Sequence, residues 1–350
     1  MLKYLRYSPT TLILLAGIVL LAAGGNCMWG QFGLILFVTV IGDFALGKDL
    51  DEPQYEQTWL LNFWLYSALP LLWAAGTVYA WYLSDFDLLG IGAAVGHLSG
   101  YDMFAARAAT TPLQMVGGAL ALGLMFAFAG TVIAHELTHR TWSKAAQIAG
   151  RWMLALSGDA SFAIEHVYGH HKNVSTRKDP ATSRRGENSY AFVVRSTIYS
   201  YLSAWHLEAE RLKKQGYSVW SWRNRMHRGN LMSLAYIAFY AYAAGWVGAL
   251  VAVAIMVYTK SYLEFVNFME HYGIVRVPGE PVEPRHSWNC NQAVSGWIMF
   301  NLTRHSHHHA MGEKPFWELR AYQDAPMLPY GYLTTIILAL VPPLFRKVVD

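Results

Sequence analysis

The stretch TVIAHELTHR, residues 131–140, decides the fold because it joins an apolar segment directly to a pair of histidines. Residues 113–134 contain no charged side chain, and His135, Glu136 and His139 then match the pattern H-E-x-x-H. Residues four apart lie on one face of a helix. The stretch therefore predicts a helix that leaves an apolar environment with two metal-binding side chains on the same face.

The same pattern is typical of zinc proteases, in which both histidines bind zinc and the glutamate acts as the general base. Two histidines and a glutamate at this spacing also serve other metals and other reactions. The pattern alone therefore leaves a protease and a different metalloenzyme as alternatives, which only the rest of the chain can separate.

The composition is that of a membrane protein. Of the 350 residues, 54% are hydrophobic and only 14% are charged, whereas soluble domains carry about 25% charged residues. Most of the apolar residues occur in long runs, so we expect one membrane-embedded domain over residues 1–350 and not two or three soluble domains.

A helix needs about 20 apolar residues to cross about 30 Å of hydrocarbon. A cleaved signal peptide is the lesser alternative for the first apolar segment, which is short and follows Lys3 and Arg6. We expect residues 86–96, which are too few to cross, and residues 332–344, which Pro342 breaks, to lie at the membrane interface. Six segments meet or approach the required length and are predicted to span the membrane: 11–25, 29–46, 59–83, 113–134, 231–248 and 249–260.

The distribution of charge predicts the orientation. Between Glu136 and Arg228 there are fifteen Lys and Arg against seven Asp and Glu, and basic loops stay on the cytoplasmic side of a membrane. Six spans with the N-terminus inside place residues 135–230 and 261–350 in the cytoplasm. We therefore expect an all-α integral membrane protein, in the cytoplasmic membrane of a bacterium, with its histidine-rich region on the cytoplasmic side.

Ten of the fourteen histidines fall in four short clusters, each beside an apolar segment on the predicted cytoplasmic face, and nine of the ten have the spacing of metal ligands. Ionisable groups at a membrane boundary are costly and usually functional. The candidate metal ligands are His135, His139, His166, His170, His171, His271, His305, His308 and His309.

Nine imidazoles are too many for one zinc, which takes at most four ligands in a structural site, so they suit two metals. Neutral nitrogen ligands favour iron, copper, nickel or zinc over magnesium or calcium. Iron is the one whose redox chemistry with dioxygen uses a large site beside an apolar cavity. The two cysteines, Cys27 and Cys290, exclude an iron–sulfur or rubredoxin module within the chain, so electrons must come from elsewhere.

Three carboxylates lie close to these histidines in the sequence. Glu165 and Glu270 directly precede a candidate ligand, and Asp159 lies a short segment upstream. Carboxylates near metal sites commonly accept the second ring N–H of a histidine and fix the orientation of its ring. We expect this role for all three, with helix caps or simple ion pairs as the alternative.

HELTHR, HVYGHHKN and RHSHHHA resemble the three histidine boxes of the integral-membrane di-iron oxygenases, a group of desaturases, hydroxylases and alkane 1-monooxygenases. EHYGIVR is similar to the additional histidine motif of the alkane 1-monooxygenases, and the stretch that includes residues 179–190 resembles the segment after their second box. The resemblance extends from about residue 42 to residue 350. It implies that the nine histidines bind two non-haem irons. The sequence does not determine which histidines bind which iron.

The resemblance also answers the question of the protease. Zinc hydrolysis has no use for the additional histidines, and Glu136 becomes a residue near the metals or at the helix end instead of a base. The family usually has an acidic residue where this chain has His307, so the role of His307 stays open. The remaining histidines match no ligand position and are expected either to be structural or to contact the metal ligands: His97, His206, His227 and His286.

The implied reaction is the hydroxylation of the terminal methyl group of medium- or long-chain n-alkanes by dioxygen, with rubredoxin and its NAD(P)H-dependent reductase as the electron source. An alkane has no polar atoms, so burial against apolar helices must hold it. Trp29, Phe32 and Phe37 are candidates for the closed end of such a channel, with core packing as the alternative.

A basic surface would attract the acidic rubredoxin by electrostatic steering. The candidate residues can equally be explained as positive charges that keep a loop inside the cell, and they are Lys172, Arg177, Lys178, Arg184 and Arg185. The other expected partners are the lipid bilayer, the alkane and dioxygen, and no nucleic acid.

Three rival functions share these features. A fatty-acyl desaturase or hydroxylase would act on an acyl chain, a xylene-type monooxygenase would act on a methyl-aromatic compound, and a metal-binding membrane protein would not catalyse a reaction. The preferred chain length and the oligomeric state are not predictable from these residues.

Overall fold

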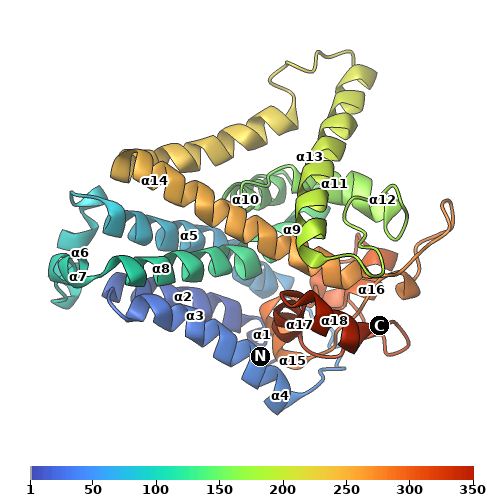
Figure 1. The fold of residues 1–350 in the computed structure, drawn as a ribbon, viewed down its shortest axis with the longest axis horizontal. Helices are drawn as coiled ribbons and strands as arrows, with labels where there is room; N and C mark the ends of the chain where they lie inside the picture. The colour runs from blue at the N-terminus through green and yellow to red at the C-terminus, as the bar shows by residue number, and fades with distance from the viewer. Residues whose placement is uncertain (1) are drawn as a thin grey trace.

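The computed structural model describes residues 2–350, and its regular elements within that range are all helices (Figure 1). The β-type pairings among these residues are two isolated bridges, Lys48 with Gln292 and Asn289 with Met327. The expected all-α class is confirmed.

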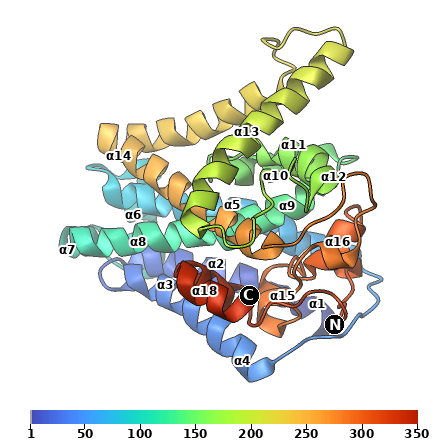
Figure 2. The same cartoon turned by 45° about the vertical axis from the view of Figure 1, so that its right-hand side comes forward.

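The long helices lie side by side along one direction and form a bundle, as Figures 1 and 2 show from two angles. Most of the buried apolar side chains belong to a single core cluster in which these helices take part. The helices of the bundle are α2 (Ser8–Ala23), α3 (Cys27–Leu36) continued by the π-helix η1 (Phe37–Ile41) and α4 (Gly42–Leu46), α5 (Thr58–Leu83), α8 (Pro112–Met125) continued by the π-helix η3 (Phe126–Thr131) and α9 (Val132–His139), and α14 (Arg225–His271).

The other elements, all short except α13, gather at the two ends of the bundle (Figure 1). One end carries η2 (Leu88–Gly90), α6 (Ile91–Ser99) and α7 (Met103–Ala109). The other carries the histidine-bearing elements and their supports, which are α1 (Leu2–Leu5), α10 (Lys144–Ala155), α11 (Phe162–Glu165), η4 (His166–His170), α12 (His171–Asn173), α13 (Ser189–Lys214), η5 (Pro284–His286), α15 (Ala293–Ile298), α16 (His305–Ala310), η6 (Phe316–Glu318), α17 (Tyr332–Ala339) and α18 (Pro342–Val349).

The helix that carries the first histidine pair is continuous from Pro112 to His139. It starts with a capping box, in which Thr111 and Gln114 satisfy each other's backbone N–H groups, and with a proline in its first turn. The π-helical segment η3 then rotates the last two turns relative to α8, since each extra residue in a turn shifts the following side chains around the axis. This rotation sets the direction in which His135 and His139 point.

The α14 element consists of two antiparallel arms (Figure 1). Ala244 and Gly245 leave helical geometry, with a φ of 60° at Gly245, and the chain reverses there. Such a φ favours glycine because a Cβ would collide with the backbone. The reversal brings the second arm back to the histidine end, where it delivers His271.

Three helices are long and apolar enough to cross a membrane: Cys27–Leu46, Pro112–His139 and Arg225–His271. The chain is accordingly an integral membrane protein. Each predicted span coincides with a helix, but the boundary expected between residues 248 and 249 lies instead at Ala244 and Gly245, and the last arm continues to His271. The expected interfacial segments 86–96 and 332–344 form short helices.

Candidate metal centre

The nine predicted ligands converge at one end of the bundle, from four separate parts of the chain. One set of five, here called the five-histidine group, has its ring nitrogens within 4.8 Å of one another. Two of its members come from α9, two from the second histidine cluster along the chain (residues 166–171) and one from α16. They are His135, His139, His166, His171 and His308.

The other four form a second set beside the first, here called the four-histidine group. His271 belongs to two overlapping potential metal sites, one with His170 and His309 and the other with Glu270 and His305. His309 Nε2 is 2.9 Å from His305 Nε2, which is 3.3 Å from His271 Nε2. The group therefore consists of His170, His271, His305 and His309. The rings of His171 and His309 stack at 4.5 Å between centroids, so the two groups share a border.

The second histidine cluster supplies both groups because it is a π-helix. Helical spacing of 3.6 residues pairs His166 with His170, but η4 has i to i+5 hydrogen bonding. His166 and His171 thus point to the same group, with their Nε2 atoms 3.1 Å apart, while His170 points to the other. Side chains five residues apart share a site here because the turn is wider.

The distances between ring nitrogens fit metal ligation. Two nitrogens bound to one ion at about 2.1 Å lie about 3.0 to 3.4 Å apart for ordinary bond angles. His171 Nε2 lies 3.1 Å from His166 Nε2 and 3.0 Å from His308 Nε2, and His170 Nε2 lies 3.3 Å from His309 Nε2. Hydrogen bonds would bring ring nitrogens together in pairs, whereas here more than two ring nitrogens lie close to one another. One metal ion in each group would account for this arrangement.

Two buried atoms support the same conclusion. Among residues 2–350, the Nε2 atoms of His135 and His139 have no hydrogen-bonding partner although both are inaccessible to solvent. A buried polar atom without a partner is rare because it loses its hydration without compensation. A metal ion within the five-histidine group would satisfy both.

The protonation of most of the cluster suits metal binding. His170 differs, because Asp179 outweighs the effect of burial and raises the pKa of this imidazole above the usual histidine value. Burial and neighbouring imidazoles hold the pKa of His166, His308 and His309 well below the usual histidine value. A neutral imidazole has a free lone pair on one ring nitrogen, which is the form that binds metals.

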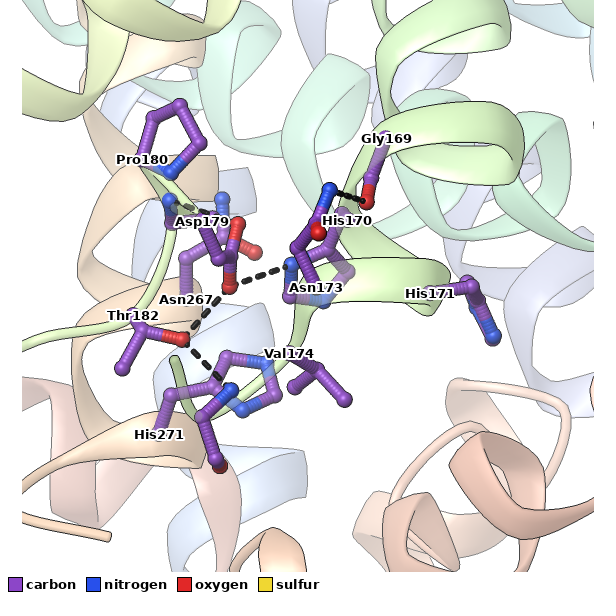
Figure 3. Close-up of polar contacts among 12 residues, drawn as sticks. Gly169, His170, His171, Asn173, Val174, Asp179, Pro180, Thr182, Asn267 and His271 are labelled. Carbon is purple, nitrogen blue, oxygen red and sulfur yellow. Dashed lines mark hydrogen bonds and ion pairs between the residues drawn. The ribbon is translucent and has the colours of Figure 1, made fainter. Parts of the chain in front are cut away.

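Asp179 orients one ligand of the four-histidine group. Its Oδ2 lies 2.9 Å from His170 Nδ1, and Figure 3 shows the carboxylate between His170 and Thr182. The Thr182 hydroxyl donates to the same oxygen at 2.5 Å, and the Ala181 N–H donates to Oδ1 at 3.0 Å. Burial opposes ionisation, but His170 and Thr182 hold the pKa of Asp179 below its usual value. An ionised Asp179 accepts the Nδ1–H of His170 and leaves Nε2 free for a metal.

Glu270 touches the four-histidine group from the side of the metal-facing nitrogens. Its Oε2 lies 3.3 Å from His305 Nε2, and its Oε1 accepts a hydrogen bond from the Tyr332 hydroxyl at 2.8 Å. The Glu270 carboxylate thus lies next to the place where a metal would bind, or is itself a further ligand. We expected it to accept the N–H of a histidine ring on the side away from the metal, but it contacts Nε2 of His305 instead.

The other three carboxylates have different partners. Glu136 forms an ion pair with Arg140 at 2.8 Å, which fits a residue at the helix end and not a general base. Asp159 pairs with Lys260 at 2.5 Å and accepts from the Ser161 hydroxyl, so it matches the ion-pair alternative. Glu165 is buried beside Gly169, and burial together with Asp179 raises its pKa to about 8.

His307 points away from the metal groups. Its Nδ1 accepts a hydrogen bond from the Arg320 backbone N–H at 2.9 Å, and its ring packs edge-on against Tyr322. It therefore anchors the loop after α16, while His305, His308 and His309 are the residues of this segment that lie in the two histidine groups.

The five-histidine group approaches the surface at one point. His139 and His171 are its two half-buried members, and Gly312 covers the ring of His171. A Cβ at Gly312 would lie 2.9 Å from His171 Cε1 and Nδ1. The absence of a side chain there lets the loop after α16 close over this edge.

A narrow chamber of about 20 Å³ lies on the membrane side of both groups. An adjoining pocket of about 50 Å³ shares Thr131 and Leu263 with it and extends past Phe128 and Tyr262, which are half-buried at the bundle surface. The walls of the chamber are mostly apolar where they are not formed by the ligands, and comprise Thr131, Val132, His135, Phe162, His166, Leu263, Val266, Asn267, Glu270, Leu302 and His305.

None of the three aromatic residues expected at the closed end of the channel lines the chamber or the adjoining pocket. Trp29 packs against the Cα of Gly117 and edge-on against Phe32, and Phe37 exposes 65% of its surface on the outside of the bundle. The walls of the chamber come instead from α9, α11 and α14. The five basic residues expected to attract a partner are all exposed, although Arg185 also pairs with Asp350 at 3.2 Å.

Asp179, Tyr332 and Gly312 were not among the predicted site residues. Asp179 stands nine residues after His170 in an irregular loop, and Tyr332 begins a helix sixty-two residues after Glu270. Their only signal in the sequence was the similarity of the surrounding segments to the alkane 1-monooxygenases, because no helical period connects them to a ligand.

Comparison with known proteins identifies relatives with the same motifs. The fatty acid desaturase family matches residues 110–338. Alkane 1-monooxygenase 1 of Pseudomonas aeruginosa is 40% identical over 68% of this chain and 63% of its own length, so this chain matches somewhat less than two thirds of that relative. Alkane 1-monooxygenase 1 of Alcanivorax borkumensis is 32% identical over 98% of this chain and 81% of its own length. The hydroxylase component of the xylene/toluene monooxygenase of Pseudomonas putida is 29% identical over 97% of this chain and 86% of its own length. The chain therefore belongs to the alkane 1-monooxygenase family, within the fatty acid desaturase superfamily.

Proposed function

We propose that the protein is a non-haem di-iron alkane 1-monooxygenase. The observation that carries the proposal is the convergence of nine histidines, in groups of five and four, directly beside an apolar chamber that reaches toward the membrane. The five-histidine group would hold one iron, and the four-histidine group with Glu270 would hold the other. The alkane 1-monooxygenases among the relatives support the choice of substrate.

The reaction converts R–CH₃, dioxygen, two electrons and two protons into R–CH₂OH and water. Bound iron would supply the activation of dioxygen. The protein's own contribution is to bind the alkane by burial, which is worth about 0.8 kcal/mol for each CH₂ group, and to keep water away from the reacting methyl group. The chamber has room for little more than one small group beside His135 and His305, so the slender end of an unbranched chain would displace fewer side chains there than a branched or cyclic substrate.

Leu263 is the residue that we propose controls access. It is buried on the second arm of α14 and forms part of both the chamber and the adjoining pocket. A chain that arrives sideways from the bilayer would pass this side chain before its terminal methyl group meets the histidines. The bilayer is also where an alkane concentrates, so a lateral route needs no passage through water.

The proposal extends to topology and to the electron donor. Six spans with the N-terminus and the histidine cluster in the cytoplasm would place the exposed basic residues between the second cluster and α13 on the side where a soluble rubredoxin is found. These residues are Lys172, Arg177, Lys178, Arg184 and Arg185. Opposite charge speeds such an encounter and salt screens it. An electron-transfer rate that does not change with ionic strength would contradict docking at this surface.

The central test combines a metal count with an assay of the product. Purified protein should contain two irons per chain, and with added rubredoxin, reductase and NAD(P)H it should convert octane to 1-octanol. One ion per chain, or oxygen consumption that does not respond to octane, would contradict the assignment. Alkene formation from a fatty-acyl substrate without any alcohol from octane would favour a desaturase instead.

A second candidate is methyl-aromatic hydroxylation, which the similarity to the xylene/toluene monooxygenase component favours. The same reaction at a benzylic methyl group would require space for a ring next to His135. Parallel assays with p-xylene and octane decide between them, because faster oxidation of p-xylene would replace the alkane as the preferred substrate.

A further inference from the structure

The helix α13 is not used by the proposed mechanism, yet it has an unusual direction. It runs across α8 and the other long helices of the bundle, and its far end projects beyond them (Figures 1 and 2). If the long apolar helices cross the membrane, a helix that crosses their direction at the histidine end lies along the membrane plane.

The first half of α13 has an exposed apolar stripe. Tyr190, Val194, Ile198 and Leu202 follow one another at intervals of four residues, and each exposes between 44% and 61% of its surface. Residues at this spacing lie on one face of a helix. A stripe of this kind in contact with water would be unfavourable, so it indicates an apolar environment along this face.

The loop after α13, residues 215–224, holds two tryptophans outward. Trp220 and Trp222 expose 83% and 67% of their surfaces. The loop is held in place at its base: Asn224 donates to the Val219 carbonyl, and Trp220 stacks on His227. Fixed, exposed indole rings are typical of the boundary between lipid and water.

A buried carboxylate secures this end of the helix. Glu208 pairs with Arg211 at 2.6 Å and with Arg225 at 2.7 Å, and it also accepts the Arg225 backbone N–H. These bonds join the end of α13 to the start of α14. The loop is therefore presented by a braced helical corner.

The charge around the loop complements anionic lipid. Residues 205–231 contain six Lys and Arg against two Asp and Glu, and one of the two acids is Glu208, which is already neutralised by arginines. Lys213, Lys214 and Arg223 remain exposed next to the tryptophans. Lysines and arginines near a membrane surface bind negatively charged headgroups.

The apolar stripe continues into surfaces that the bundle already presents to the membrane. At one end, the first arm of α14 exposes Leu231 and Leu234. At the other, the Tyr190 hydroxyl donates to the Leu340 carbonyl, and Leu340 and Val341 are exposed beside it. Exposed apolar side chains therefore lie beside both ends of the stripe on α13.

We propose that α13 and the loop 215–224 form an in-plane membrane anchor on the leaflet nearest the histidine cluster. The stripe of Tyr190, Val194, Ile198 and Leu202 faces the acyl chains, the two tryptophans lie at the headgroups, and the basic residues bind anionic phospholipid. Amphipathic helices with apolar, aromatic and basic residues arranged in this way lie in the interface and do not span it. This inference is independent of the proposed function, because it requires only that the bundle crosses a membrane.

The test measures the surroundings of single positions in the full-length protein. Cys27 is the exposed native cysteine and would be replaced by serine, while the buried Cys290 stays. Spin labels at I198C and, as the matched control on the same helix, at K213C are examined in bilayer discs of phosphatidylcholine and phosphatidylglycerol. Collisions with dioxygen report an apolar surrounding, and collisions with a water-soluble nickel chelate report water.

The expected result is that dioxygen exceeds the nickel chelate severalfold as a collision partner at residue 198, with the reverse at residue 213. Dominance of the nickel chelate at residue 198 would overturn the proposal. Protection of residue 198 from both reagents would also overturn it, because a second copy or another protein would then cover the stripe.

A second measurement needs no cysteine. Lipids brominated on the acyl chain close to the headgroup quench nearby indoles, so they should quench the wild-type protein more than the variant with W220F and W222F. Equal quenching of the two proteins would place the tryptophans in water and contradict the proposal. Replacing phosphatidylglycerol by phosphatidylcholine should reduce the difference if the basic residues bind the anionic headgroup.

Discussion

The substitution Asp179→Asn tests how the protein prepares a ligand for its metal. Asp179 Oδ2 faces His170 Nδ1 and also accepts from Thr182, while Oδ1 accepts from the Ala181 N–H. Asparagine has one oxygen for these two positions. If its oxygen stays with Ala181, its NH₂ group faces His170 and favours the tautomer with a proton on Nε2, which cannot bind a metal. If its oxygen faces His170, the Ala181 N–H loses its acceptor.

Either arrangement weakens the four-histidine group. Loss of a carboxylate that orients a metal ligand typically reduces metal affinity by about 10- to 100-fold, which corresponds to about 1.4 to 2.8 kcal/mol. We expect Asp179→Asn to lose one of two irons during competition with a chelator at a concentration that leaves the wild type intact, and to lose octane hydroxylation in parallel. Thr182→Val removes the bond to Oδ2 and the acceptor of the Ser175 backbone N–H, and it should have a smaller effect of the same kind on metal affinity.

The control is Asp324→Asn, which makes the same chemical change at an exposed position. Metal analysis after chelator competition and circular dichroism of each variant separate loss of metal from loss of fold. Retention of both irons by Asp179→Asn at every chelator concentration that spares the wild type would refute the role assigned to this carboxylate.

Three further outcomes follow from other parts of the molecule. Gly312→Ala places a methyl group 2.9 Å from the ring of His171 and should reduce iron in the five-histidine group, whereas Gly33→Ala, which meets open space, should leave the metal count unchanged; equal iron in both would show that the loop yields. Leu263→Ala should admit longer or bulkier substrates, as measured by competition among alkanes of different length. Leu263→Trp should abolish octane hydroxylation while both irons stay bound. An unchanged product profile in both variants would exclude this route. Glu208→Gln should destabilise the protein by about 1 to 3 kcal/mol, since it leaves charged hydrogen-bonding partners unsatisfied. Although burial opposes it, Arg211 and Arg225 lower the pKa of Glu208 to about 2, so its contribution is complete above about pH 4.5 and is lost as the pH falls toward 2, which acid unfolding of wild type and Glu208→Gln would measure.

Hydropathy was sufficient to place the helices but not the turn within α14. The segment from Leu231 to Lys260 carries no charge that marks a boundary before Lys260. Two glycines, Gly245 and Gly248, are near the expected turn, and only Gly245 adopts the positive φ that reverses the chain. Gly248 lies against the Tyr240 carbonyl across the turn. Which glycine turns depends on the packing of the two arms, which the sequence pattern does not contain.

The convergence of the nine histidines was predictable, while their division into two groups was not. Residues four apart on a helix share a face, so each cluster could direct its histidines to one side. Four such clusters together held too many histidines for one metal and therefore predicted a site with two. The division into five and four depends on η4, where His166 and His171 share a group although an α-helix would pair His166 with His170. A π-helical turn depends on the packing of the folded chain, and no residue pattern in the sequence predicts it. The chamber was missed for a related reason, since Leu263 is one apolar residue among many until α14 packs against η3.

The arrangement of buried carboxylates gives a reason for two divalent ions at this depth. Asp179, Glu165 and Glu270 are all buried beside the histidine groups, and each ionised carboxylate in such a place is costly without a positive neighbour. Burial, with Asp179 in addition, raises the pKa of Glu165 to about 8, so the neutral form of this carboxyl is favoured until positive charge is brought close to it. Two cations within neutral imidazoles would supply that charge, lower the pKa of Glu165 and be held by the carboxylates in return. The histidines alone would bind many transition metals. The three buried carboxylates add to this by favouring the occupancy of both histidine groups at the same time.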